Sequence, residues 1–171
     1  GLWELYDNDH KSLGYFDWVI SAVPAPQANE ILPEVFAFRD IISEIEMSAC
    51  FSLMVGFKRP VELEFDAAIV KNSDISWISL NSSKPDRIGN SSVLVHSSNK
   101  WADKNIDIGP ERASHHLLNT LSNTIDLPVD NLAFKDLKFW RYANVSKQKN
   151  DQVFLDVANR LGACGDWCIK G

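Results

Sequence analysis

The sequence lacks any apolar run long enough to cross a bilayer, and its first residues have neither the basic nor the apolar region of a signal peptide. It also lacks clusters of lysine and arginine, and its formal net charge is -6. Binding to nucleic-acid phosphates needs clustered positive charge, so a nucleic-acid partner is excluded. These absences predict a cytoplasmic protein that binds neither a membrane nor a nucleic acid.

Cysteine is scarce, and its count is odd. The three residues, Cys50, Cys164 and Cys168, are irregularly spaced, which fits reduced thiols better than a disulfide framework. Cys164 and Cys168 could hold zinc together with histidines. However, no second pair of ligands stands at metal-binding spacing, so the sequence predicts no metal site.

Glycine-rich and catalytic signatures are also missing. The chain has 8 Gly and 7 Pro, and no Gly-x-Gly-x-x-Gly phosphate fingerprint occurs in its 171 residues. Spacing alone reveals neither a Ser/His/Asp set nor a paired-carboxylate motif, so no catalytic residue is predicted. With 45% hydrophobic residues, the composition is that of a globular protein long enough for one domain, or for one domain and pieces of a neighbour.

The segment 16–27 contains the most informative pattern. An apolar run, Trp18-Val19-Ile20, is followed by the small residues Ser21 and Ala22 and then by two prolines, Pro24 and Pro26. The run predicts a strand buried on both faces, and the prolines stop the strand and turn the chain. In α/β sheets, ligands bind at the carboxyl ends of strands, and small residues there let a planar ligand approach the backbone.

The remaining patterns predict an α+β fold: a mostly antiparallel mixed sheet with one long helix packed on it. Strands are expected at 2–6, 47–57, 67–71, 75–80, 92–96, 137–143 and 161–164, and short helices within 28–38. The long helix is expected over 110–125, with Pro110 in its first turn. Its apolar face comprises Ala113, Leu117, Leu118, Leu121 and Ile125.

Three motifs resemble the flavin-dependent amine oxidase superfamily, and within it the renalase-like proteins. They are Pro24-Ala25-Pro26-Gln27-Ala28, Trp140-Arg141-Tyr142-Ala143 and Gly165-Asp166. The resemblance implies FAD as cofactor and oxidation of a small molecule by hydride transfer to the flavin, with dioxygen as acceptor. Renalase-like enzymes imply reduced nicotinamide isomers as substrates, whereas the wider superfamily implies amines.

The same resemblance implies the cofactor-binding residues. Ala22, Val23 and Pro24 are expected beside the FAD, together with Gly165 and Asp166, so segments near the two ends of the chain must meet in space. The Asp166 carboxylate would accept a hydrogen bond from a hydroxyl of the ribityl or phosphate-linked portion. Asp166 could instead be a helix N-cap, and both roles can hold together.

Four residues are expected to line a substrate pocket: Trp140, Phe51, Trp77 and His96. Trp140 is the first choice because it lies on the strand that resembles the family's substrate-side strand. A core tryptophan is the alternative for Trp140, and a histidine satisfied by a local carbonyl is the alternative for His96. The adjacent pair His115 and His116 is assigned no function.

The resemblance also predicts the domain organisation. Residues 1–30 and 159–171 would be partial strands of an FAD-binding domain, and 31–158 would be the substrate domain. The chain is therefore expected to be a fragment without the N-terminal FAD-binding half, and FAD is expected in the full-length protein rather than in the fragment. The alternative is a non-catalytic binding or interaction domain.

Overall fold

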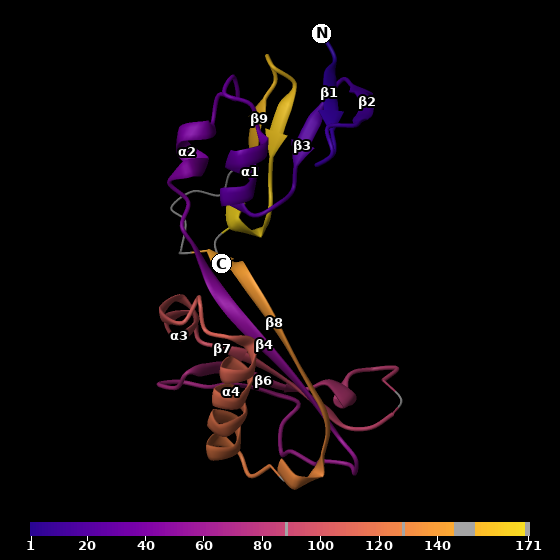
Figure 1. Ribbon diagram of the computed structural model, residues 1–171, viewed down its shortest axis with the longest axis vertical. Coiled ribbons are helices and arrows are strands. Elements are labelled where there is room, and N and C mark those ends of the chain that lie inside the picture. Colours follow the sequence, from indigo (N-terminus) through magenta and orange to yellow (C-terminus); the bar gives the residue numbers. More distant parts are fainter. Residues whose placement is uncertain (88, 128, 146–152, 170–171) are drawn as a thin grey trace. The chain divides into compact units, whose positions relative to one another are not determined.

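The computed structural model forms two compact units (Figure 1). The terminal unit comprises residues 1–47 and the described residues from 144 onward, and the central unit comprises 48–143. The residues described are 1–87, 89–127, 129–145 and 153–169. The chain enters the central unit between Met47 and Ser48 and leaves it between Ala143 and Asn144. The domain boundaries expected from the sequence lie after residues 30 and 158.

The terminal unit begins with an antiparallel ribbon of β1 (Trp3–Tyr6) and β2 (Ser12–Phe16). The connecting turn is stabilised by Asp7, whose Oδ1 accepts hydrogen bonds from the backbone N–H groups of Asp9 and Lys11. The strand and polar turn predicted at this end are confirmed.

A three-stranded sheet follows in the terminal unit, in the order β3-β10-β9. Its strands are β3 (Val19–Ser21), β9 (Phe154–Asp156) and β10 (Leu161–Ala163). The helices α1 (Ala25–Ile31) and α2 (Arg39–Ser43) share an apolar core with β9 and β10. The first predicted helix is confirmed, but it begins at Ala25, directly after Pro24. The helix α2 begins at Arg39, beyond the range 28–38 in which one or two short helices were expected.

The expectation that β3 is buried on both faces is wrong. Ser21 is buried, but the side chain of Ile20 is 60% exposed. Val19 packs against the core of the terminal unit, so the neighbouring Ile20 points to the opposite face of the strand. Among the described residues, that face is therefore left uncovered at Ile20.

Asp156 joins β9 to two loops of the terminal unit. Its carboxylate is buried and accepts three hydrogen bonds, from the backbone N–H of Ala37 (3.0 Å), the backbone N–H of Asn159 (3.0 Å) and Asn159 Nδ2 (2.8 Å). The bonds from the side chain and backbone of Asn159, then that from Ala37, hold the pKa of Asp156 below its ordinary value.

This depressed pKa predicts that acid destabilises the fold through Asp156. The stabilisation is complete above the ordinary carboxyl pKa of about 4 and is lost as the pH falls through the lower pKa of the folded state. Asp156→Asn should lower the free energy of unfolding at pH 7 and make it less dependent on pH below about 4. Urea denaturation between pH 7 and pH 2 measures both effects. Asp40→Asn, an exposed control on α2, should retain the acid dependence of the wild type. If the stability of Asp156→Asn fell with pH in parallel with that of the wild type, Asp156 would not be the source of the acid sensitivity.

The central unit is built on a five-stranded sheet in the order β5-β6-β7-β4-β8. The strands are β4 (Met47–Phe57), β5 (Ala67–Ile69), β6 (Ile75–Leu80), β7 (Ser92–Ser97) and β8 (Leu132–Val145). β4 pairs antiparallel with β7, and so do β5 with β6 and β6 with β7. The prediction for 47–57 is confirmed at both ends, whereas β8 is longer than the predicted 137–143.

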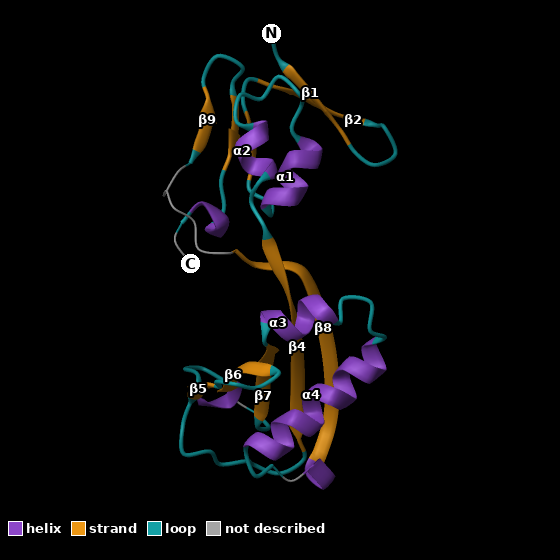
Figure 2. Cartoon of the chain, turned by 90° about the vertical axis from the view of Figure 1, so that its left-hand side faces the viewer, coloured by secondary structure: helices purple, strands orange, loops and turns teal. Residues whose placement is uncertain are grey.

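One face of this sheet is covered by α3 (Asn99–Lys104) and α4 (Pro110–Thr124), and Figure 2 shows α4 lying across the strands. Ala113, Leu117 and Leu121 of α4 are fully buried against the odd-numbered residues of β4, such as Leu53 and Val55. The helix predicted over 110–125 and its apolar face are confirmed. Short 3-10 helices complete the described chain at Asn81–Ser83, Val129–Asn131 and Asp166–Cys168.

The fold class predicted from the sequence is confirmed: the chain is α+β, with mostly antiparallel sheets and one long helix packed on the larger sheet. Among the described residues, no helix is both long enough and apolar enough to cross a membrane.

Candidate cofactor and substrate sites

The predicted meeting of the two distant segments is confirmed. β3 and β10 are adjacent and parallel, with Leu161 opposite Val19 and Ala163 opposite Ser21. Parallel neighbours end at the same edge of a sheet, so the turn after β3 and the Gly-Asp motif after β10 lie side by side. The backbone N–H of Cys164 extends the ladder by donating to the carbonyl of Ser21 at 2.9 Å.

Trp167 locks the two segments together beyond the sheet. Its indole Nε1 donates a 2.9 Å hydrogen bond to the carbonyl of Val23, and its ring is stacked 5.8 Å from that of Phe154. The side chain is 1% exposed and belongs to the core of the terminal unit. Trp167 therefore fixes the backbone of the turn after β3 relative to the Gly-Asp motif.

Gly165 makes this arrangement possible. A Cβ at Gly165 would lie 2.3 Å from Nε1 of Trp167 and 2.6 Å from its Cδ1, so a side chain there is incompatible with the tryptophan position. The Gly-Asp motif in the sequence identified Gly165, but the sequence analysis assigned no role to Trp167. No local pattern signals that indole, because its role depends on a contact across 144 residues.

The polar groups at this edge are suited to a cofactor. Ser21 Oγ is buried and has no hydrogen-bond partner among the described residues. The exposed Asp166 is the first residue of the 3-10 helix, and Gly165 occupies the N-cap position. The alternative of Asp166 as the N-cap is therefore wrong. Ala22 is exposed, while Val23 and Pro24 are half-buried. The contacts of these residues with FAD stay predictions.

A second candidate site lies on the face of the central sheet opposite α4. His96 of β7 pairs directly with Ser52 of β4 and with Trp77 of β6. Directly paired residues project to the same face, so these three side chains form one row across the sheet. Phe51 projects to the other face, where its ring is 5.4 Å from that of Trp101 in the helix-side core.

Trp140 projects to the same face as this row. Its neighbour Phe139 packs with its ring centroid 4.6 Å from that of Phe51, on the helix side. Side chains alternate along a strand, so Trp140 points to the opposite face, where it is 58% exposed. The structure thus brings Trp77, His96 and Trp140 to one face and places Phe51 on the other.

His96 is half-buried, and burial lowers the pKa of its imidazole. The lowered pKa favours the neutral ring at neutral pH, which can accept a proton at one nitrogen and donate from the other. Ser52 beside it is buried and adds a hydroxyl. The row therefore combines one aromatic side chain, that of Trp77, with two neutral polar groups, those of His96 and Ser52.

The three cysteines are free thiols. Cys164 lies at the end of β10, and Cys168 is buried in the core of the terminal unit. Within the described part of the chain, no group of three or more His, Cys, Asp and Glu residues is placed to hold a metal ion.

The fold of the chain is similar to that of several solved structures, whereas no protein-family model matches the sequence. Three similar solved structures are a protein provisionally named protoporphyrinogen oxidase from Exiguobacterium sp. 255-15 (TM-score 0.73, 13% identity), cyclohexylamine oxidase from Brevibacterium oxydans IH-35A (0.65, 11%), and wild-type putrescine oxidase bound to putrescine (0.65, 12%). They cover 98%, 96% and 91% of this chain respectively.

The chain spans only 39%, 40% and 39% of those three structures, in the same order. At such low sequence identity, the likeness concerns the fold alone. The chain therefore has the fold of a part of these oxidases.

Proposed function

We propose that the chain is a portion of an FAD-dependent oxidoreductase of the flavin amine oxidase superfamily, of renalase-like type. The observation that carries the proposal is the convergence of β3 and β10, which puts the turn at Pro24 beside Gly165 and Asp166. The similar solved structures named as oxidases support the same class. When bound, the flavin would accept a hydride from a small substrate and pass its electrons to dioxygen.

The terminal unit would supply cofactor contacts. The exposed Asp166 carboxylate would accept a hydrogen bond from a flavin hydroxyl, and the small side chain of Ala22 would let the cofactor approach the backbone. Trp167 would hold both segments in place through its bond to the carbonyl of Val23. The FAD pyrophosphate would be held by a nucleotide-binding half outside these residues, since the Gly-rich fingerprint is absent from them.

The central unit would supply substrate contacts through its open sheet face. Trp77 and Trp140 would provide apolar walls for a small molecule, and His96 with Ser52 would orient it. An amine substrate that loses a hydride would become an iminium, whose N–H proton the neutral imidazole of His96 would accept, whereas a reduced nicotinamide isomer would lose its hydride without releasing a proton. Phe51 would stabilise this face from behind as a core residue.

Asp166→Asn is expected to weaken flavin binding by about tenfold, because it replaces a charged acceptor with a neutral one. The measurement uses the natural polypeptide that contains these residues. Flavin absorbance retained after desalting, and titration of the apoprotein with FAD, report the affinity. Glu30→Gln, an exposed control on α1, should leave the affinity unchanged.

A wild-type protein that stays colourless and takes up no FAD would overturn the proposed function and favour the non-catalytic binding domain. Equal FAD affinity in wild type and Asp166→Asn, with flavin bound, would overturn the role of Asp166 alone.

The substrate class within this proposal is tested by anaerobic reduction of the flavin. Reduced nicotinamide isomers are the renalase-type candidates. Amines are the alternative, which the similarity to putrescine oxidase and cyclohexylamine oxidase favours. Bleaching of the flavin absorbance by one class and not by the other would assign the substrate.

A further inference from the structure

The central unit carries a hollow that belongs to neither candidate site. It lies beside the outward face of α4, next to β8, and is lined by Glu111, Arg112, His115, His116, Asn119 and Lys135. The whole chain has a net charge of -6, yet this lining contains two permanent cations, two histidines and a single carboxylate. The hollow is therefore a locally basic surface on an acidic chain.

The carboxylate in the lining is already engaged. Glu111 Oε2 lies 3.5 Å from Nζ of Lys135, and both side chains are accessible to solvent. Such an exposed pair is weak, so Lys135 can turn to another anion at little cost. Arg112, on the next position of α4, is exposed and contributes a guanidinium with several N–H donors.

The hydrogen bond between His115 and Asn119 assigns the roles of the two ring nitrogens of His115. Asn119 Nδ2 lies 3.2 Å from Nδ1 of His115, so the amide donates and Nδ1 accepts. The proton of the neutral ring is then on Nε2, which presents a second type of N–H donor. His115 is exposed on the helix surface.

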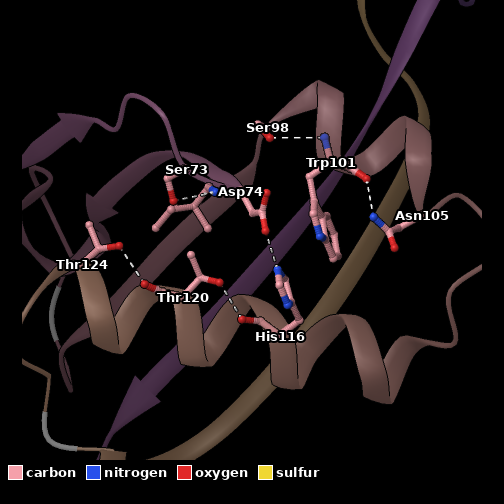
Figure 3. Close-up of polar contacts among 9 residues, drawn as sticks. Ser73, Asp74, Ser98, Trp101, Asn105, His116, Thr120 and Thr124 are labelled. Atoms are coloured by element: carbon pink, nitrogen blue, oxygen red, sulfur yellow. Dashed lines mark hydrogen bonds and ion pairs between the residues drawn. The ribbon is translucent and has the colours of Figure 1, made fainter.

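The neighbouring His116 anchors this turn of α4, as Figure 3 shows. Its Nε2 lies 2.9 Å from Oδ2 of Asp74 in the turn after β5, and its ring is stacked on Trp101 of α3 at 4.8 Å and 3°. The Thr120 hydroxyl also donates to the His116 carbonyl. These contacts hold His116 in place, and the Asp74 carboxylate that it engages is not among the residues lining the hollow.

From these contacts we propose that the hollow binds the phosphate group of a small anion. Phosphate oxygens accept hydrogen bonds, and the hollow offers a guanidinium from Arg112, an ammonium from Lys135 and the Nε2–H of His115. The donors come from two elements, α4 and β8, that line the same hollow. The solvent exposure of the charges predicts an affinity on the order of millimolar.

The test follows the histidine ring signals of the natural polypeptide that contains these residues by proton NMR, at fixed pH and ionic strength, as inorganic phosphate replaces chloride. His115→Gln assigns the signal of His115. The expected result is a saturable shift of the His115 signal, while His10 in the β1–β2 turn does not respond. Arg112→Gln and Lys135→Gln should each raise the dissociation constant by about threefold to tenfold.

Glu111→Gln is the reciprocal variant. It removes the carboxylate of the lining and frees Lys135, so it should tighten phosphate binding severalfold. Equal shifts at His10 and His115, or unchanged binding in both Arg112→Gln and Lys135→Gln, would overturn the site. A mononucleotide serves as a second ligand. If the mononucleotide binds more tightly than inorganic phosphate, the ligand of the hollow is a phosphate ester. If the two bind equally, the ligand is the free phosphate anion.

Discussion

Replacing Trp167 with alanine is expected to lower the free energy of unfolding of the terminal unit by about 3–5 kcal/mol. The side chain is 1% exposed, stacks near Phe154 and fills the core between the turn after β3 and the end of β10. Its removal would leave a cavity and the carbonyl of Val23 without its 2.9 Å partner. Chemical denaturation followed by far-UV circular dichroism measures the loss.

Trp167→Phe separates packing from hydrogen bonding. Phenylalanine retains an aromatic ring but has no N–H group, so this variant should lose only about 1–3 kcal/mol. If Trp167→Ala were as stable as the wild type to within about 1 kcal/mol, the indole would not hold the two segments together. The turn after β3 and the Gly-Asp motif would then be held together by the β3–β10 pairing rather than by Trp167.

The second large effect is expected at Phe51 in the central unit. Phe51→Ala should lower the free energy of unfolding by about 3–5 kcal/mol, because the ring is 2% exposed and packs against both Trp101 and Phe139. Denaturation of the variant and the wild type under identical conditions gives the difference.

Trp140→Ala is the matched comparison for Phe51→Ala. Trp140 is 58% exposed, so its truncation should change stability by less than about 1 kcal/mol. If the proposed function holds, Trp140→Ala should also weaken substrate binding, whereas Phe51→Ala should act through folding. A large loss of stability in Trp140→Ala would show that this tryptophan is a core residue, the alternative that the sequence left open.

Much of the fold follows from local patterns. The strand at 47–57 and the helix beginning at Pro110 were predictable because an apolar run and a helical apolar face are strong signals over more than ten residues. The second helix was missed because Arg39–Ser43 is only five residues long, which is too short to show a helical period. The long strand β8 was underestimated because most of its side chains are exposed.

The candidate sites show where local patterns stop being sufficient. The motif at Pro24 and the Gly-Asp motif predicted two turns that meet, and the structure joins them through adjacent parallel strands. The four aromatic and histidine positions could not be sorted from the sequence, because a strand with buried and exposed faces assigns them by register. A shift of one residue exchanges the faces, and pairing with His96 places Trp77 and Ser52 on one face and Phe51 on the other.

By itself, the sequence determined the α+β class, the position of the long helix, the acidic charge and the two glycine- or proline-marked turns, since each depends on neighbouring residues. Only the tertiary structure decided that Trp167 reaches Val23, that Phe51 is a core residue and that Lys135 faces α4. Those contacts join residues far apart in the chain. Their formation depends on strand order and register, which arise from the packing of the whole core rather than from any one segment.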